Sequence, residues 1–471
     1  MVPHLATTLL AAAAPAPVLS PGDTAWMLAS SALVLLMTPG LAFFYGGLTR
    51  SKSTLNMMMM SFICIVIVSI LWVLFGFKLA FGSSTTSGLF GDFSWSHLSN
   101  AAGQIVAFGG TGTGIPVIVF AAFQLMFAII TPALISGAIA DRTKFLSWSI
   151  FATLWAIIVY FPVAHWVFDF GALGGTPGWL TSLWAPVKDG VQSAAGVEDF
   201  AGGTAVHINA GAAALALAIV LGKRVGFKKN PMRPHNVPWV LLGSGLLWFG
   251  WFGFNAGSAV GSNGLAGLAF MNTQVATAAA LGGWLLVEYF RDGKPTSVGA
   301  ASGAVAGLVA ITPACGFITP WASIVLGLLA GAVCAFAVGL KYKLGYDDSL
   351  DVVGVHLVGG IFGTLFIGFF SSTDVNSFAN NGVFYGGGWE QLGRQAVGAA
   401  SVFAYSFIAA LVIGYAIKFT IGFRVSEDVE VEGIDINEHS ESAYEFDIQS
   451  SNGAIPSGHL ADASASKEVH A

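Results

Sequence analysis

Charged residues are scarce in this chain. Only 9% of its 471 residues are Asp, Glu, Lys or Arg, 55% are hydrophobic, and the mean hydropathy is +0.74. A soluble globular protein carries about 25% charged residues, so this composition excludes an ordinary soluble domain and places most of the chain in a lipid bilayer. Of the 25 acidic residues, 11 follow residue 424. The formal net charge of −6 therefore reflects an acidic C-terminal tail.

Cysteine is equally scarce. The three cysteines, Cys64, Cys315 and Cys334, stand in apolar surroundings without the spacing of a zinc site or a disulfide framework. No HxxxH or HExxH motif is present, and no basic stretch has the density of a nucleic-acid surface. We therefore expect no metal, no cofactor and no nucleic-acid partner.

Long apolar runs take up most of the chain. A helix of about 20 apolar residues crosses the hydrocarbon core of a bilayer, and eleven such runs can be marked out. The sequence thus predicts an all-α integral membrane protein with eleven transmembrane helices. The expected spans are residues 24–46, 57–82, 115–139, 145–168, 201–222, 236–257, 268–290, 296–315, 320–341, 352–371 and 397–423.

The positive charges predict how these spans are oriented. Lys and Arg gather in short cytoplasmic loops, and 16 of the 19 follow an odd-numbered span; the exceptions are Lys78, Lys188 and Arg394. This pattern predicts an N-terminus outside the cell and a C-terminus in the cytoplasm. The length and the short loops are typical of a protein in a bacterial inner (plasma) membrane.

Residues 1–22 allow two interpretations. An apolar run from Leu5 to Ala14 leads into an Ala-rich segment of the kind that ends a signal peptide. However, no Lys or Arg precedes the run, and Pro15 and Pro17 follow the two Ala-x-Ala sites, where proline disfavours cleavage. The segment is either a cleaved signal peptide or an N-terminal extension, and we favour the extension.

One short pattern occurs twice. The runs Val-His-Ile-Asn-Ala-Gly at 206–211 and Val-His-Leu-Val-Gly-Gly at 355–360 place His207 and His356 in matching frames. Because an odd number of spans separates them, spans 6–10 should form an inverted repeat of spans 1–5, with span 11 left over. Substrate sites in such folds lie near the midplane between the halves. A single buried histidine can be a packing residue, but two in matching frames favour a paired imidazole site.

Two acids precede these spans. Asp199 stands ahead of span 5 and Asp351 ahead of span 10. A carboxylate in such a place can cap a helix N-terminus and interact favourably with the helix dipole. For Asp199 we hold direct binding of a cation equally open. We take Asp351 as its cytoplasmic counterpart, with a capping role.

Aromatic residues gather where three spans reach the predicted outer face. Any one of them could belong to a lipid-facing belt or to the core, but their joint position predicts an outer vestibule. Ring faces attract a partly desolvated cation by about 2 kcal/mol, and a hydroxyl can accept an N–H hydrogen bond. The residues are Phe123 and Phe127 in span 3, Trp166 and Phe168 in span 4, and Trp251, Phe254 and Ser258 in span 6.

Over residues 24–445 the chain resembles the ammonium transporter family, Amt/Mep with the Rh proteins as distant relatives. The resemblance implies an eleven-span homotrimer that serves nitrogen utilisation, with one substrate path in each subunit. The runs that carry it are Gly-Leu-Ala-Phe-Phe-Tyr-Gly-Gly at 40–47, Asp-Phe-Ala-Gly-Gly-Thr-Ala-Val-His-Ile-Asn at 199–209, Gly-Trp-Phe-Gly-Phe-Asn-Ala-Gly-Ser at 250–258, Thr-Pro-Ala-Cys-Gly at 312–316 and Asp-Val-Val-Gly-Val-His at 351–356.

By this resemblance, NH4+ is recruited at an outer aromatic site, loses its proton at a phenylalanine gate, and crosses an apolar pore as NH3. Whether the proton follows separately stays open. The implied recruitment residues are Phe127, Trp251, Ser258 and Phe168 or Trp166, above the acid Asp199; the gate is Phe123, Phe127 and Phe254; the pore histidines are His207 and His356.

One position departs from the family pattern. The recruitment site usually includes a tryptophan near the end of span 4, where this chain has Phe168, with Trp166 two residues earlier. Either the wall is Phe168, with a weaker cation–π face, or Trp166 takes its place. The apparent affinity for ammonium depends on which of the two faces the substrate.

The predicted organisation is the segment 1–22, an eleven-span domain at 23–423 and a cytoplasmic regulatory tail at 424–471. The tail resembles the family at 432–444, which implies that it packs under the cytoplasmic face and couples subunits, with a PII-type signalling protein as a partner. The Ser/Ala-rich remainder has the composition of a disordered segment.

The sequence leaves two other functions to consider, a sensor and an enzyme. An ammonium sensor would signal through the tail, but sensors of this family usually append a kinase or cyclase domain, and the 48 residues from 424 to 471 are too few for one. A membrane hydrolase using Asp199 with the histidines would lack a nucleophile or a metal set. We therefore expect a transporter and no enzyme.

Overall fold

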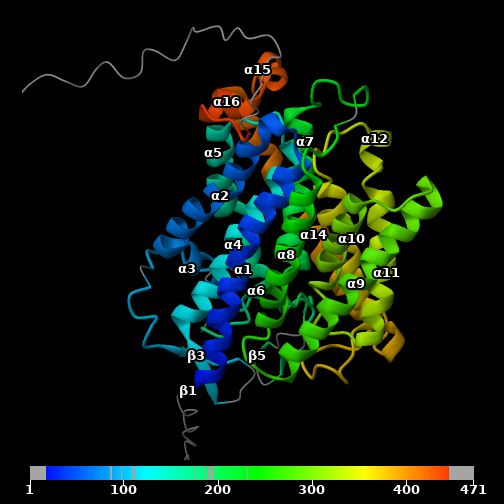
Figure 1. The fold of residues 1–471 in the computed structure, drawn as a ribbon. Helices are drawn as coiled ribbons and strands as arrows, with labels where there is room; N and C mark the ends of the chain where they lie inside the picture. Colours follow the sequence, from blue (N-terminus) through cyan, green and yellow to red (C-terminus); the bar gives the residue numbers. More distant parts are fainter. Residues whose placement is uncertain are drawn as a thin grey trace, which may run out of the picture.

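The computed structural model describes residues 17–84, 87–96, 98–108, 112–173, 175–185, 187–188, 191–192, 196–230 and 232–444. Most of the predicted segment 1–22 and the last part of the tail lie outside these residues. Long helices aligned along one direction make up the body of the molecule (Figure 1). Two short helices, α15 (Glu427–Glu432) and α16 (Ile434–His439), lie at one end, which we name the tail end; the opposite end is the far end.

The predicted all-helical membrane fold is confirmed. Ten helical segments in the described residues are long and apolar enough to cross a bilayer, and they lie at ten of the eleven expected positions. They are Pro21–Leu48 (α1), Ser51–Phe81 (η1 Ser51–Ser53, α2 Thr54–Leu71, η2 Trp72–Gly76, α3 Phe77–Phe81), Val117–Ile139 (α4 Val117–Ser136, η3 Gly137–Ile139), Phe145–Phe168 (α5 Phe145–Trp155, η4 Ala156–Tyr160, α6 Phe161–Phe168), Gly203–Leu221 (η5 Gly203–Ile208, α7 Asn209–Leu221), Val237–Gly257 (α8), Gly264–Asp292 (α9), Pro320–Leu344 (α11 Pro320–Ala337, α12 Leu340–Leu344), Val353–Phe370 (η6 Val353–Leu357, α13 Val358–Phe370) and Glu390–Thr420 (α14).

Two expected spans differ from the observed helices. The span expected at 296–315 is the shorter helix α10 (Ser297–Ile311), of 15 residues, and turns follow it. The last span begins at Glu390 instead of residue 397. Polar residues such as Gln391, Arg394 and Gln395 are buried in the first turns of that helix, which a search for apolar runs does not recognise as helix.

Small residues let α1 and α8 pack closely. A side chain at Gly47 would place its Cβ 2.7 Å from the Asn236 carbonyl oxygen, and one at Gly243 would lie 2.3 Å from the Phe44 backbone nitrogen. Both distances are too short for non-bonded atoms, so any larger residue would push the two helices apart. Close backbone approach of this kind is how helices associate in lipid.

Short strands lie at the far end of the bundle. Strand β1 (Val18–Leu19) pairs in parallel with β3 (Thr113–Pro116), which pairs antiparallel with β2 (Ile105–Val106). A second hairpin joins β4 (Val187–Lys188) to β5 (Val191–Gln192), and a short 3-10 helix, η7 (Val383–Tyr385), precedes α14. Strand β3 leads directly into α4, so α4 runs from the far end toward the tail end.

Acidic side chains attach the tail to the bundle. Asp435 accepts hydrogen bonds from the backbone nitrogens of Leu55 and Asn56 at 2.9 and 2.8 Å, and Glu438 accepts one from Phe145 N at 2.9 Å. These amides belong to the first turns of α2 and α5, where a negative charge interacts favourably with the helix dipole. The tail acids therefore act as caps supplied from a distant part of the sequence.

Candidate functional site

The two predicted histidines meet in the interior of the bundle. His207 lies in η5 and His356 in η6, both side chains are buried, and their Nδ1 atoms are 3.2 Å apart. Helix α7 ends at Leu221, near Val225, which hydrogen-bonds Glu430 of α15 at the tail end. Helix α13 ends at Phe370, and the next residue, Ser371, hydrogen-bonds Glu198 at the far end. The two histidines therefore approach each other on helices that run in opposite directions.

The hydrogen bond between the rings constrains their protons. Only one of the two Nδ1 atoms can donate, because the other must accept. In the neutral pair, one ring then carries its proton on Nδ1 and leaves Nε2 as an acceptor, while the other carries it on Nε2 as a donor. His207 Nε2 has no partner within the described part of the chain. The pair can thus offer one acceptor and one donor to a small molecule.

Both oxygens of Asp199 are fully engaged by backbone amides. Oδ1 accepts from Gly202 N and Gly203 N at 2.8 and 2.7 Å, and Oδ2 accepts from Thr204 N and Ala205 N at 2.8 and 3.0 Å. A carboxylate has about four lone-pair sites, so all of them are used. Of the two roles left open for Asp199, the geometry favours capping of η5 over direct contact with a cation.

The counterpart of Asp199 is Asp348, and the prediction of Asp351 is wrong. Asp348 accepts from Val352 N and Val353 N at 3.1 and 2.7 Å at the start of η6. Asp351 instead forms an ion pair with Lys341 at 2.7 Å. The signal in the sequence was the offset, since Asp199 and Asp348 each stand eight residues before their histidine. Asp351 is only the acid closest to the apolar run.

A column of aromatic rings leads to the histidines. Phe127 and Phe254 lie with ring centroids 4.1 Å apart, and Phe168 meets Phe127 edge-on at 6.3 Å. Phe254 lies 6.3 Å from His207, which stacks on His356 at 5.3 Å. The Phe127 and Phe254 side chains are 1% and 0% exposed, so both rings are buried between Phe168 and the histidines.

The remaining predicted aromatic residues line the side of this column. Phe123 meets Phe127 edge-on at 4.9 Å. Trp251 stacks on His207 at 5.4 Å and donates from Nε1 to Thr312 Oγ1 at 2.7 Å. Sequence reasoning missed Thr312, although it opens the Thr-Pro-Ala-Cys-Gly run. Its hydroxyl fixes the plane of the indole that covers His207.

Trp166 lies apart from the column. Its Nε1 donates to the Leu89 carbonyl at 2.5 Å, and its ring packs on Trp179 and Tyr405 at 5.7 and 4.8 Å. Residues two apart on a helix point to nearly opposite sides, which is why Phe168 faces Phe127 and Trp166 does not. Of the two alternatives for the aromatic wall, the structure supports Phe168.

Ser258 lies one turn beyond Phe254, at the C-terminal end of α8. Its hydroxyl donates to the Phe254 carbonyl at 2.8 Å, and the residue is partly exposed. With its proton engaged in the helix, the oxygen can still accept an N–H hydrogen bond from a substrate.

The three cysteines are free and buried. Within the described part of the chain, no group of three or more His, Cys, Asp and Glu side chains could hold a metal ion. What this site offers is a hydrogen-bonded imidazole pair next to closely packed phenyl rings.

Comparison with known proteins decides the family. A model described as the Ammonium Transporter Family matches residues 25–444. The chain belongs to the ammonium transporter family. Among the described helices, the match covers α1 from its fifth residue and all of the others, including both short helices of the tail.

Relatives within the ammonium transporter family cover nearly the whole chain. A protein of Mycobacterium tuberculosis (strain ATCC 25618 / H37Rv), named Ammonium transporter, is 54% identical over 92% of this chain and 92% of its own length. Among solved structures, Mep2 of Saccharomyces cerevisiae is 34% identical with a TM-score of 0.78, covering 87% of this chain and 90% of that one. A structure named Sensor Amt Protein is 29% identical with a TM-score of 0.77, covering 89% and 98%.

The family model and the curated relative are named for ammonium transport, which supports a transporter and not an enzyme. A sensor function is not favoured, because the curated relatives with the higher identity carry the transporter name. The chain is therefore a multi-pass membrane protein of an ammonium transporter family.

Glu198, next to Asp199, is a buried acid that the sequence patterns do not single out. Its carboxylate accepts from Ser371 Oγ at 2.7 Å and from Asn380 N at 2.5 Å, and its own backbone nitrogen donates to Gln395 at 2.8 Å. These contacts tie the start of η5 to the segment after α13 and to α14. Burial raises the pKa of the Glu198 carboxyl to about 7, against the lowering effect of these hydrogen bonds.

This pKa predicts a pH dependence of stability. An unfolded glutamate titrates near pH 4.3, so between about pH 4.3 and 7 the folded state retains a proton that the unfolded state releases. The stabilisation that the folded state gains from protonated Glu198 is fully present below this window, and it is lost as the pH rises through it. We expect Glu198→Gln, which stays neutral, to gain thermal stability relative to the wild type between pH 5 and pH 8.

The measurement is the melting temperature of both proteins in detergent at pH 5 and pH 8. The exposed tail acid Glu427 gives the control, because Glu427→Gln removes a carboxylate that solvent already surrounds. A constant difference between Glu198→Gln and the wild type across this range would show that Glu198 titrates normally.

Proposed function

We propose that this chain recruits NH4+ at an outer aromatic site, deprotonates it at a phenylalanine gate and conducts NH3 past its two histidines. The observation that carries the proposal is the contact between His207 and His356 at 3.2 Å, next to the closely packed Phe127 and Phe254. Phe168 and Ser258 form the recruitment site, Phe123 belongs to the gate, and Asp199 holds η5 in place. Trp251, expected among the recruitment residues, lies instead against His207 at 5.4 Å.

Deprotonation follows from the cost of moving a charge into the apolar interior. An ion at the centre of a bilayer costs at least about 2.5 kcal/mol and, without compensation, far more. NH3 is neutral, and its hydrogen bonds can be met by the Nε2 acceptor and the Nε2–H donor of the histidine pair. K+ resembles NH4+ in size and charge but has no proton to lose, so the same route rejects it.

We propose the remaining features from the family resemblance. The chain forms a homotrimer in the inner (plasma) membrane, with its N-terminus outside, its tail in the cytoplasm and a PII-type protein as a partner. Spans 1–5 and 6–10 form an inverted repeat. This last proposal is supported by the opposite directions of α7 and α13 and by the matching π-helical segments η5 and η6, each with its acid eight residues before the histidine.

Transport is tested with the purified full-length protein in proteoliposomes. We expect wild-type vesicles to accumulate methylammonium faster than protein-free vesicles and to leave a K+ gradient intact. Ammonium binding without uptake would contradict the proposal and favour a sensor. Current recorded in the same vesicles decides whether the proton follows the ammonia.

The position of Phe168 predicts a gain in affinity. Tryptophan presents a stronger cation–π face than phenylalanine, and Phe168 already lies against Phe127. We expect Phe168→Trp to lower the ammonium concentration for half-maximal uptake about two- to fivefold, which corresponds to about 0.5–1 kcal/mol. The matched control is Trp166→Phe, which we expect to leave this concentration unchanged. The opposite ranking would return Trp166 to the recruitment site.

A further inference from the structure

A cavity of about 410 Å³ opens at the tail end of the bundle, away from the histidine column. One wall comes from the loop between α7 and α8, at residues 224–230 and 232, and the other is the short helix α12. Its lining includes Arg224, Phe227, Lys228, Lys229 and Asn230 from the loop and Tyr342 from α12. The proposed transport of ammonium does not use these residues.

The walls of this cavity are fixed by specific contacts. The Phe227 and Tyr342 rings stack with centroids 5.7 Å apart and planes 12° apart, which joins the loop to α12. Within the loop, Lys229 N and Asn230 N both donate to the Gly226 carbonyl at 2.9 Å. The cavity is therefore held by an ordered turn and an aromatic pair.

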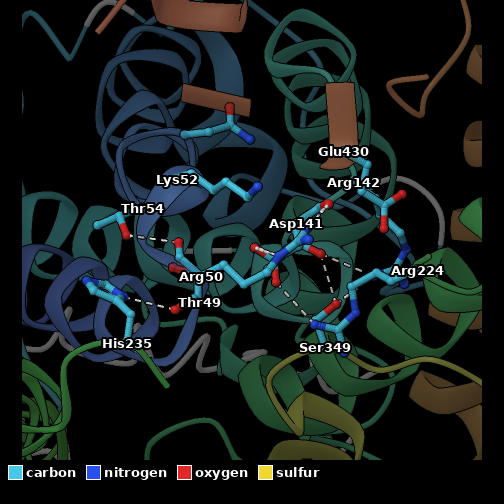
Figure 2. A network of polar contacts seen from close by, with 12 residues as sticks. Thr49, Arg50, Lys52, Thr54, Asp141, Arg142, Arg224, His235, Ser349 and Glu430 are labelled. Atoms are coloured by element: carbon cyan, nitrogen blue, oxygen red, sulfur yellow. Dashed lines mark hydrogen bonds and ion pairs between the residues drawn. The ribbon is translucent and has the colours of Figure 1, made fainter. Parts of the chain in front are cut away.

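Arg224 lies at the back of the cavity, and protein carboxylates already balance its positive charge. It pairs with Asp347 at 2.8 Å and with Asp141 at 3.2 Å, and Asp141 also pairs with Arg50 at 3.6 Å. Figure 2 shows this network with Arg142 and Glu430 beside it. The guanidinium thus serves to anchor the loop, and its charge is balanced by protein carboxylates.

Lys228 and Lys229 differ from Arg224 in this respect. Across the described residues, neither has a carboxylate within ion-pair distance. The segment 222–236 holds five Lys and Arg residues and no Asp or Glu. The charge of the cavity therefore excludes a cation and favours an anion, and the Asn230 amide supplies further hydrogen-bond donors.

We propose that this cavity binds the phosphate group of an anionic ligand, held by Lys228, Lys229 and Asn230 beside the Phe227–Tyr342 pair. Phosphate suits a site of two lysines and an amide, because several oxygens can accept at once. Phe227, Met232 and Tyr342 line the same cavity, and Tyr342 is 53% exposed. Apolar residues beside a basic site are what the headgroup and first chain carbons of a phospholipid would contact, so a phospholipid is the favoured source over a free phosphate.

The experiment measures binding by the full-length protein in detergent and does not depend on transport. The probes are short-chain phosphatidylglycerol, short-chain phosphatidylcholine and inorganic phosphate. A Lys or Arg near a membrane surface contributes about 1 kcal/mol toward an anionic lipid. We therefore expect Lys228→Gln/Lys229→Gln to weaken phosphatidylglycerol binding by about tenfold or more and to leave phosphatidylcholine binding unchanged.

Two controls separate this site from general charge. Lys228→Arg/Lys229→Arg keeps the charge and should bind as the wild type does. Lys294→Gln removes one charge from an exposed loop away from the cavity and should have no effect. Selective binding of inorganic phosphate in place of the lipid would identify the source as a soluble phosphate. Equal binding by the wild type and the double Gln variant, or equal weakening by Lys294→Gln, would overturn the site.

Discussion

Replacing His207 by Asp is expected to let K+ pass where the wild type excludes it. A carboxylate about 4 Å from a cation contributes about 4 kcal/mol at an effective dielectric constant of 20, which offsets much of the cost of bringing the ion into the apolar column. That energy corresponds to a rise in K+ flux of about two orders of magnitude or more. His356→Asp should act in the same way, because the two rings share one hydrogen bond.

The test is K+ flux and current in proteoliposomes that contain each variant. His207→Gln is the matched control, since it is neutral and can still hydrogen-bond to His356. We expect this control to keep the exclusion of K+ while its ammonium uptake falls. If both Asp variants excluded K+ as well as the wild type does, the histidines would have no part in selectivity.

Much of this site could be predicted from the sequence, because its main features repeat. The two Val-His frames identified His207 and His356, and the odd number of spans between them predicted that they approach from opposite sides. The apolar composition was enough to predict the helices, because few backbone structures are possible in lipid. Every backbone polar group in the hydrocarbon must be paired within a helix or a closed barrel. The position of the histidines then follows from helix length.

The features that the sequence did not predict depend on direction and register. The rotation of α6 about its axis decides whether Phe168 or Trp166 faces the column, because these two residues point to nearly opposite sides of the helix. The π-helical segments around both histidines leave no trace in hydropathy. Asp348 was overlooked because a search for the acid nearest to an apolar run ignores the offset at which a carboxylate reaches the first amides of the helix.

The role of Asp199 carries the second large effect. Asp199→Ala would leave four buried amide groups without their acceptor. Each unpaired buried donor costs about 1–3 kcal/mol, so we expect a loss of about 4 kcal/mol or more of stability and the loss of uptake, because η5 would no longer hold His207 against His356. Asp348→Ala is the matched comparison. It frees two amides, so the loss in melting temperature should be smaller.

Two further variants separate capping from attraction of the cation by charge. Asp199→Asn removes the charge but keeps one oxygen that can accept from Gly202 and Gly203, and asparagine caps helices well. Asp199→Glu keeps the charge but displaces the carboxylate from the four amides. Capping therefore predicts that Asn retains at least as much uptake and thermal stability as Glu. If Glu instead transported like the wild type while Asn was inactive, the carboxylate would act on the ammonium ion through its charge, and its four short bonds to the backbone would serve to orient that charge.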